Sequence, residues 1–365
     1  METRVARKDL LAELIPMQGV VERKSTIPVL SHILLRAEGG ELHLAATDLD
    51  VSLTASCEAE IQGDGAIAVQ ARKFIEIMRA ASGDEVHLLL ENENQLRIEV
   101  GRSRFKINGL SAEDFPTLPE VSSDGRLAIP YQQLSEMISK VLFAVSTEES
   151  RFQLNVALRK CTDGVLSIVA TDGYRLALVE NDLDGATEGD GVLVPRKALQ
   201  ELQRLDGDGT ISFGRGEHHL SFRVGPRELT CRILEGSFPD YDRVIAKDND
   251  KVVIIDRSAL NEAVQRVALL TGDRARAIRC EFGDDGLTVS ATNPDLGEAT
   301  EELECSVEGG DVRIGINPDY LSNFLAAVGT DKVRLELKDE NTQCVGFPVD
   351  GGDRRYLCVV MPMRI

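Results

Sequence analysis

The stretch Ile168-Val-Ala-Thr-Asp172 decides the fold, because the chain carries two further copies of it. These copies are Leu44-Ala-Ala-Thr-Asp48 and Val289-Ser-Ala-Thr-Asn293, and the successive threonines stand 124 and 121 residues apart. An aromatic residue or Met before Pro also recurs, at Phe115-Pro116, Phe238-Pro239 and Met361-Pro362, with a spacing of 123 residues. Two landmarks with one period predict three duplicated domains that together fill the 365 residues.

Each copy begins with a predicted amphipathic helix, whose apolar residues recur at i, i+3, i+4 and i+7. The apolar positions are Leu10, Leu11, Leu14 and Ile15, then Leu134, Met137, Ile138, Val141 and Leu142, then Leu260, Ala263, Val264 and Val267. Short alternating strands follow, and a second helix begins shortly after Val69, Leu193 and Ile314. This content is typical of an α+β fold, with two helices packed on small antiparallel sheets in each copy. Polar turn regions place the three domains at residues 1–122, 126–247 and 251–365.

The composition is that of a globular chain with an unusual charge. Hydrophobic residues make up 42% and charged residues 28%, while 41 Lys and Arg against 61 Asp and Glu give a net charge of −20. A chain this acidic repels nucleic acid on average, although a local basic surface is not excluded. The sequence has neither an apolar run long enough to span a bilayer nor an apolar amino-terminal segment. Seven scattered cysteines without a Cys-x-x-Cys pair favour reduced thiols and a cytoplasmic location.

Motifs for catalysis are missing or incomplete. The sequence has no phosphate-binding loop of the Gly-x-x-x-x-Gly-Lys-Ser/Thr type, and Gly63-Asp-Gly65 lacks the third glycine of a dinucleotide fingerprint. His218-His219 lacks the spacing that places two metal ligands on one helical face. Asp48-x-Asp50 is better explained as a strand-end turn in which Asp accepts backbone N–H groups. Ser103 and Lys106 lie on opposite faces of their strand. We therefore expect no catalytic residue, no metal site and no cofactor.

The predicted second helices of the first two copies are basic. Arg72, Lys73 and Arg79 accompany a single Glu76, and Arg196, Lys197 and Arg204 accompany a single Glu201. Further basic residues on or beside the opening helices are Arg7, Lys8, Lys24, Lys140, Arg266, Arg274 and Arg276. Either these are solvated helix faces, or together they form a surface that faces a polyanion. The third copy departs from the pattern, since residues 317–328 contain no Lys or Arg.

With these motifs the chain resembles the bacterial DNA polymerase III β subunits, the sliding clamps of replication. The resemblance covers the whole chain and depends on the threefold repeat, on VATDGYRLA from Val169, on GSFPDY from Gly236 and on the terminal VVMPMRI. It implies a homodimer assembled head-to-tail into a six-domain ring, with helices inside and sheets outside. Such a ring encircles duplex DNA without sequence preference and tethers the replicative polymerase. It is a processivity factor without catalytic activity of its own.

The resemblance also implies site residues. The DNA-contacting positions fall on Lys24, Arg72, Glu148, Phe152 and Gln153. The pocket for partner peptides falls on Leu154, Thr171, Gly173, Tyr174, Arg175, Leu176, Pro239, Arg243, Val244, Val360, Met361, Pro362, Met363 and Arg364. Three positions depart from the family pattern. Glu148 and Gln153 differ from the polar and aromatic residues that suit DNA contact, and Glu148 repels phosphate. Tyr174 is larger than the expected side chain. The pocket is expected to receive Leu or Phe anchors from a polymerase or from the clamp loader.

Two strands of opposite charge predict the dimer seam. Arg102, Arg104 and Lys106 alternate with Phe105 and Ile107 in an edge-like strand of the first copy. The third copy offers an acidic run with a nearby apolar helix end, namely Glu298, Glu301, Glu302 and Glu304 with Leu269 and Leu270. Pairing the two edges would cover an aggregation-prone strand and match opposite charges. The alternative is that both are unrelated surface strands.

Two other classes of function stay open at this point. One is an enzyme with an unrecognised site, and the other is a non-catalytic three-domain scaffold that binds proteins but not DNA. The carboxy-terminal segment Val359–Ile365 has two interpretations as well. It is either a last core strand or part of an apolar groove in which two methionines give an adaptable surface.

Overall fold

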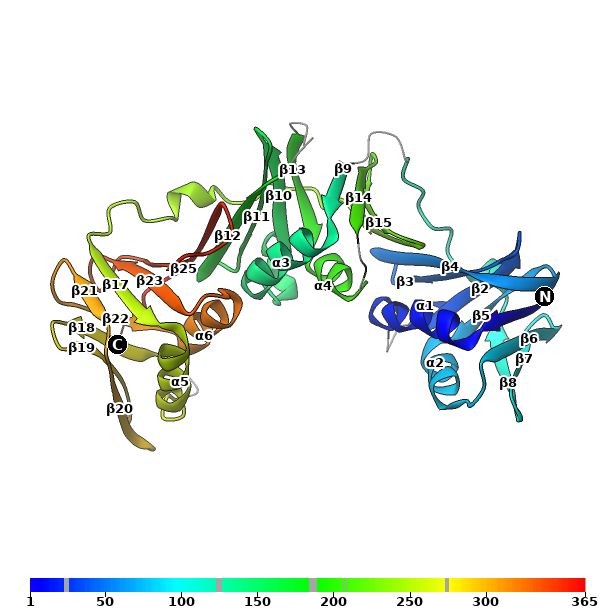
Figure 1. The fold of residues 1–365 in the computed structure, drawn as a ribbon, viewed down its shortest axis with the longest axis horizontal. Coiled ribbons are helices and arrows are strands. Elements are labelled where there is room, and N and C mark those ends of the chain that lie inside the picture. The colour runs from blue at the N-terminus through cyan, green and yellow to red at the C-terminus, as the bar shows by residue number, and fades with distance from the viewer. Residues whose placement is uncertain are drawn as a thin grey trace. The chain divides into compact units, whose positions relative to one another are not determined.

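The computed structural model describes residues 1–22, 26–122, 127–183, 189–205, 207, 209–272 and 276–364. The chain divides into two compact units, one of Met1–Ser135 with Lys197–Leu234 and the other of Glu136–Arg196 with Glu235–Ile365. The division therefore passes through the middle copy. Figure 1 labels the elements along the chain.

The three copies contain the two helices and the short strands that the repeat predicts. The first has β1 (Glu2–Ala6), α1 (Arg7–Val20), β2 (His32–Glu38), β3 (Glu41–Thr47), β4 (Val51–Gly63), β5 (Gly65–Gln70), α2 (Ala71–Ala80), β6 (Glu85–Asn92), β7 (Gln95–Val100) and β8 (Ser103–Leu110). The second has β9 (Leu127–Pro130), α3 (Tyr131–Val141), β10 (Val156–Thr162), β11 (Val165–Thr171), β12 (Arg175–Asp182), β13 (Gly189–Pro195), α4 (Arg196–Arg204), β14 (Thr210–Arg215), β15 (His219–Val224) and β16 (Arg227–Arg232). The third has β17 (Lys251–Asp256), α5 (Arg257–Ala268), β18 (Ile278–Gly283), β19 (Gly286–Asn293), β20 (Gly297–Leu303), β21 (Ser306–Glu308), β22 (Val312–Ile316), α6 (Pro318–Ala327), β23 (Lys332–Leu337), β24 (Cys344–Pro348) and β25 (Arg355–Val360).

The sheets of neighbouring copies join. In the first unit, β4 pairs with β16 and closes a 12-stranded sheet in the order β1-β6-β7-β8-β5-β2-β3-β4-β16-β15-β14-β9. In the second unit, β12 pairs with β25 within the nine-stranded sheet β13-β10-β11-β12-β25-β24-β23-β17-β21. A separate four-stranded sheet has the order β20-β19-β18-β22. Strands of two successive copies thus share one sheet at each junction.

The helices cover the sheets with their apolar faces. In the first unit α1 packs on α2, β3 and β4, and in the second unit α5 packs on α6 and on β18 to β20 (Figure 1). The predicted apolar positions of the opening helices are buried, with three exceptions. Ile15 is 47% exposed, and Leu11 and Leu142 are half-buried. For Ile15 the prediction was wrong, because the buried face of α1 turns through Leu10, Leu14 and Met17.

A repeated contact fixes the two helices of each copy. The first residue of the opening helix donates hydrogen bonds to carbonyl groups at the end of the second helix, where the backbone has no partner of its own. Arg7 donates to Met78 O and Gly83 O at 3.0 and 2.7 Å, and Arg257 donates to Leu325 O and Thr330 O at 3.3 and 2.8 Å. In the middle copy the Tyr131 hydroxyl donates to Leu202 O at 3.2 Å. The same contact between the two helices thus recurs in all three copies, made by Arg in two and by Tyr in the third.

The cysteines behave as the sequence predicted. All seven are free, and six are buried. Burial raises the pKa of Cys57, Cys231, Cys280 and Cys344 to about 12. Within the described ranges, no helix is long and apolar enough to cross a membrane.

Candidate functional site

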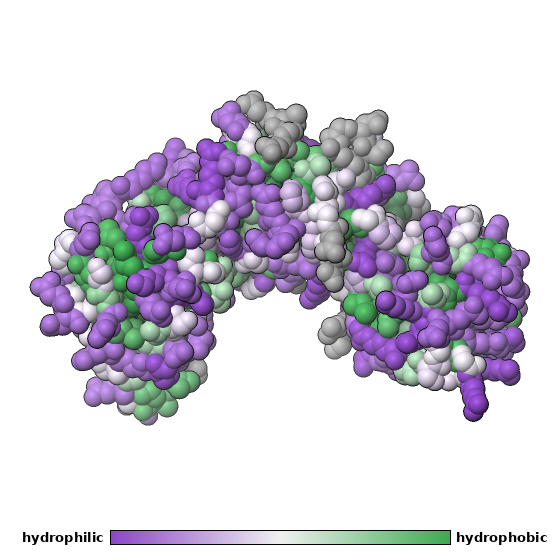
Figure 2. All heavy atoms as spheres, in the orientation of Figure 1, coloured by the Kyte–Doolittle hydropathy of each residue, from purple (hydrophilic) through white to green (hydrophobic). Residues whose placement is uncertain are grey.

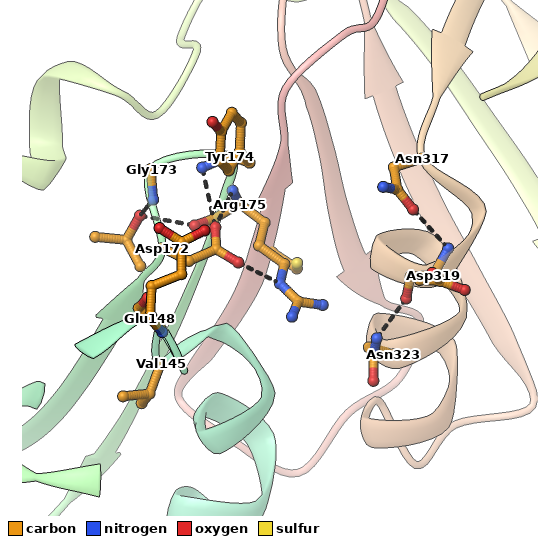
Figure 3. A network of polar contacts seen from close by, with 12 residues as sticks. Val145, Glu148, Asp172, Gly173, Tyr174, Arg175, Asn317, Asp319 and Asn323 are labelled. Carbon is orange, nitrogen blue, oxygen red and sulfur yellow. Dashed lines mark hydrogen bonds and ion pairs between the residues drawn. The ribbon is translucent and has the colours of Figure 1, made fainter. Parts of the chain in front are cut away.

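The turn between β11 and β12 forms one wall of the predicted pocket. Thr171 Oγ1 donates to Arg175 O at 2.7 Å and accepts from Gly173 N at 3.1 Å. Asp172 Oδ1 accepts from Tyr174 N and Arg175 N at 2.9 and 3.0 Å, while its Oδ2 accepts from Arg175 Nε at 3.0 Å (Figure 3). Gly173 has φ +89°, a conformation that glycine adopts without strain. The turn is therefore rigid, and it fixes both Tyr174 and Arg175.

The carboxy-terminal residues form the second wall. Val360 lies opposite Arg175 in the β12–β25 pair, and beyond it Met361 N donates to Tyr174 O at 2.9 Å. Pro362 has no N–H to continue the ladder, and Met363 N donates instead to Gly315 O of β22 at 2.8 Å. The segment Met361–Arg364, which we call the tail, therefore leaves β25 and crosses to another sheet. Val360 is buried, but Met361, Pro362 and Met363 stay half-exposed and Arg364 is exposed.

The segment after β16 supplies the third wall. Phe238, Tyr241 and Val244 pack against a buried apolar cluster that contains Leu176, Val359 and Ile245. Pro239 and Arg243 remain exposed, and Arg243 pairs with Asp240 at 2.7 Å. Leu154 lies beside the turn, since its Cδ1 is 3.8 Å from the position that a Cβ of Gly173 would occupy. The three walls thus come from separate parts of the chain.

The sequence did not reveal the aromatic residues around Arg175. Its guanidinium lies 4.5 Å from the ring centre of Tyr320 in α6 and 5.3 Å from that of Phe143. Tyr174 stacks on Tyr320 with ring centres 6.4 Å apart, and the Arg151 guanidinium lies 5.3 Å from the Tyr174 ring. Burial, and next the Asp172 charge, raises the pKa of Tyr320. No local sequence pattern indicates the contact of Tyr320 with Arg175, because the two residues are 145 positions apart in the chain.

The predicted DNA-contacting residues are only partly described. Lys24 lies outside the described residues, as does the side chain of Phe152. The Arg72 side chain is 77% exposed, and it shares Glu76 with Lys73, at 2.8 and 2.7 Å. These hydrogen bonds, that of Lys73 first, lower the pKa of Glu76. Glu148 pairs with Arg151 at 2.9 Å, so a cation that the sequence argument missed offsets its charge. Gln153 is exposed.

Several cations of the basic helices have structural partners. Arg196 donates to Leu142 O and Val145 O at 3.0 and 2.6 Å, and Lys197 donates to Val20 O at 2.8 Å and also pairs with Asp48. Other pairs are Lys140 with Asp353, Arg266 with Glu301, and Arg276 with Asp319. Arg274 lies outside the described residues. The predicted basic surface is therefore smaller than the sequence count, since many cations pair with carbonyl groups and carboxylates of the same chain.

The two predicted seam strands both have an open edge among the described residues. β8 pairs with β7 along its length but with β5 only at Gly109 and Leu110, and β20 is an outer strand of its four-stranded sheet. Arg104 has a side chain 81% exposed, Phe105 and Ile107 are half-buried, and Arg102 and Glu298 are exposed. Glu301 already accepts two hydrogen bonds from Arg266, at 2.6 and 2.8 Å.

An apolar patch accompanies the acidic seam strand. Leu269 is 76% exposed and Leu296 59% exposed, whereas Leu270 is half-buried. Figure 2 shows apolar residues where the ends of α5 and β20 lie in Figure 1, within a mostly hydrophilic surface. Such exposed leucines often mark an interaction surface.

The motifs rejected from the sequence have structural roles. Asp48 Oδ1 accepts from Asp50 N and Val51 N at 3.0 and 2.7 Å, which makes it the turn residue that the sequence predicted. Asn293 accepts from Asp295 N at 2.9 Å in the third copy. Across the ranges that the structure describes, no group of three His, Cys, Asp or Glu side chains could hold a metal ion.

Comparisons with known proteins agree with this architecture. Family models described as the N-terminal, central and C-terminal domains of the DNA polymerase III beta subunit match residues 1–119, 128–240 and 242–364. Relatives named beta sliding clamp, from Pseudomonas aeruginosa and Caulobacter vibrioides, are 37% and 36% identical over 100% of this chain and 100% of their own. A crystal structure of the Pseudomonas aeruginosa subunit has a TM-score of 0.94 at 36% identity, with both chains covered to 100%. A second, of that clamp bound to griselimycin, has a TM-score of 0.93 at 37% identity and the same coverage.

The fold and these matches define a sliding clamp built from three duplicated domains. The chain belongs to the DNA polymerase III beta subunit family. The predicted resemblance, α+β fold and sliding-clamp function are thereby confirmed.

Proposed function

We propose that two copies of this chain form a closed ring around duplex DNA and hold the replicative polymerase through the pocket beside the tail. The protein then acts in the cytoplasm as a processivity factor, without cofactor and without catalysis of its own. The observation that carries the tethering role is the path of the tail. Two hydrogen bonds, from Met361 N to Tyr174 O and from Met363 N to Gly315 O, hold both methionines half-exposed next to a rigid turn.

Helix geometry supports two chains rather than one. Two helices per domain at an interaxial spacing of ~9 Å give three domains a ring ~17 Å across between axes. Subtracting the helix diameter of ~10 Å leaves a hole ~7 Å wide. This hole is narrower than the ~12 Å major groove of DNA. With the same helix spacing, a ring of six domains has a hole at least ~24 Å wide. The dimer is thus the smallest ring that admits a duplex.

Complementary strand edges support a head-to-tail seam. β8 of one protomer would present Arg102 and Arg104 with Phe105 and Ile107, and the partner would present Glu298 and Glu302 with Leu269 and Leu270. Opposite charges guide such an approach, and the leucines lose exposed apolar surface in the closed ring.

Phosphate contacts inside the ring would come from Arg72 and Lys73 and from Lys24 and the 148–153 loop. Such contacts are independent of base sequence and allow sliding, while the net charge of −20 discourages DNA from binding elsewhere.

The pocket would serve the polymerase and the clamp loader in turn, through short peptides with Leu or Phe anchors. Methionines adapt to different apolar partners because they are unbranched and flexible. Griselimycin is bound in a structure of the Pseudomonas aeruginosa relative, and we expect it to bind this chain as well.

Removing the tail tests the tethering role. A variant that ends at Val360 should lose at least about tenfold in affinity for a synthetic peptide with adjacent Leu and Phe anchors, because one wall of the pocket is gone. Its dimer and melting temperature should stay close to those of the full chain, since β25 is complete. Lys332→Ala, a substitution at an exposed position of β23 outside the pocket, serves as the control. Wild-type peptide affinity in the truncated protein would place the pocket elsewhere.

A further inference from the structure

Three arginines surround a hollow on the domain that carries the tail. The hollow is a cavity of about 360 Å³ whose lining includes Arg279, Arg313, Arg364, Gly315, Glu340 and Met363. We call it the arginine hollow. None of its charged residues belongs to the walls of the peptide pocket except Arg364 at the end of the tail.

Strand register explains why the hollow forms. Arg279 of β18 lies opposite Gly315 of β22, and Arg313 lies two residues before Gly315 on the same face of the strand. Gly315 has no side chain to fill the space between the two arginines. On its other edge Gly315 O accepts from Met363 N at 2.8 Å, which brings the tail alongside. The tail thus runs from the turn at Tyr174 to the hollow.

The charges of the hollow are incompletely balanced. Arg313 pairs with Glu340 at 3.2 Å. Among the residues that the structure describes, neither Arg279 nor Arg364 has an ionic partner. Two cations without a carboxylate partner, in a chain of net charge −20, create a local site for anions.

An acidic cavity next to the arginine hollow restricts the kind of anion that can bind there. It shares Arg313 but is lined by acidic residues of the adjoining loops and strand, among them Asp284, Asp285, Asp311 and Glu302. A nucleic-acid backbone that entered the arginine hollow would meet these carboxylates on one side. One or two carboxylates of a short peptide segment would not.

We propose that the arginine hollow binds acidic side chains that flank the apolar anchors of the docking peptide. This inference rests on the proposed function, because it places the anchors in the pocket beside the tail. The acidic flank would follow the tail toward Gly315 and replace the missing countercharge of Arg279 and Arg364. Partners with an acidic flank would then bind more tightly than partners with a neutral one.

Peptide pairs test the hollow. Each pair carries the same Leu and Phe anchors and either Asp-Asp or Asn-Asn, placed before the anchors in one pair and after them in the other. The peptides are compared in calorimetric titrations at low salt. In the pair whose flank reaches the hollow, the Asp-Asp peptide should bind the full-length protein about threefold to tenfold more tightly than the Asn-Asn peptide. The advantage should disappear in Arg279→Gln/Arg364→Gln and shrink at high salt. Lys332→Gln, a charge change on exposed β23, should preserve it.

The possible failures are distinguishable. If all peptides bind the wild type equally, the proposed role of the hollow is wrong and the proposed pocket is unaffected. The same conclusion holds if the double variant still prefers the Asp-Asp peptide. Absence of binding by any peptide overturns the pocket and the hollow together. If the double variant instead weakens DNA retention and leaves the peptides unaffected, the hollow serves nucleic acid and the inference is wrong.

Discussion

Asp172 shows how much of the proposed peptide pocket depends on one side chain. Its carboxylate accepts hydrogen bonds from Tyr174 N, Arg175 N and Arg175 Nε. Asp172→Ala leaves these donors without a partner, and we expect unfolding measured in urea to become easier by about 1–3 kcal/mol. The affinity for an anchor peptide should fall as well, because Tyr174 and Arg175 lose their fixed position. Glu308→Ala, at an exposed site on β21 in the same unit, is the control. An unchanged peptide affinity in Asp172→Ala would mean that the turn does not shape the pocket.

Single residues also show where sequence reasoning ends. The role of Asp172 in a turn follows from local chemistry, because Asp bonds backbone N–H groups two and three residues ahead. The stack of Arg175 on Tyr320 does not, since the two residues meet only after two domains have packed. The same holds for Arg196 and Lys197, which the sequence counts as surface charges and the fold uses to bond carbonyl groups.

At the scale of elements, α4 packs on α1 through an unusual carboxylate. Glu201 is 3% exposed, and a Cβ on Gly19 would lie 1.9 Å from its Oε2. Arg204 donates to Oε1 at 2.7 Å, but Oε2 has no partner. Burial raises the pKa of Glu201, although Arg204 and Lys197 oppose the shift.

A raised pKa means that the folded protein holds this proton more tightly than the unfolded chain does. The contribution of Glu201 to stability is therefore present below about pH 4.5 and is lost as the pH rises through the raised value. Between pH 5 and pH 8, the free energy of unfolding of the wild type should fall relative to that of Glu201→Gln. Urea titrations at both pH values measure the difference. Parallel pH profiles for the two proteins would show that Glu201 is not the titrating group.

The two sheet junctions share one backbone hydrogen-bond pattern but carry different side chains. Arg232 N donates to Asp50 O at 3.0 Å, as Met361 N does to Tyr174 O at 2.9 Å. The pair Ser52–Thr230 at the first junction corresponds to the buried pair Leu176–Val359 at the second. Anchor peptides need an apolar floor, so the first junction, with hydroxyl groups there, should not bind them.

We accordingly expect one anchor peptide per chain, and we expect Leu176→Ser to remove all of the binding. Calorimetric stoichiometry measures both quantities, and circular dichroism checks that the variant stays folded. Thr288→Ser, at a half-buried site on β19, is the control. Residual binding of one peptide per chain in folded Leu176→Ser would locate a site at the first junction.

For the whole molecule, the repeat predicted three copies but not the joining of their sheets. Each copy alone has the alternating pattern of small antiparallel sheets, and nothing in that pattern shows which strand edge meets the next copy. The β4–β16 and β12–β25 pairs form between copies, because each copy leaves an unpaired edge there. The predicted boundaries at residues 122–126 and 247–251 stay a prediction.

Charge reversal tests the proposed ring seam. Arg102→Glu/Arg104→Glu should weaken the dimer, as should Glu298→Arg/Glu302→Arg, because like charges would face each other. In a mixed ring one seam joins the two reversed strands and the other joins the two unchanged strands, so opposite charges meet at both seams and mixing the two variant proteins should restore much of the association. Sedimentation equilibrium gives the dissociation constants, and reversal of Glu113, an exposed residue that belongs to neither strand, is the control. If the mixture dissociates as readily as each variant alone, the two strands do not pair directly.

We propose above all that the protein holds DNA by enclosing it. The most direct measurement loads the protein with a clamp loader onto nicked circular DNA, removes free protein by gel filtration, and then cuts half of the sample once with a restriction enzyme. We expect the protein to stay with the intact circles at high salt and to leave the linear molecules over their ends. Equal retention on circular and linear DNA would contradict it, and retention on neither would favour a scaffold that binds proteins alone.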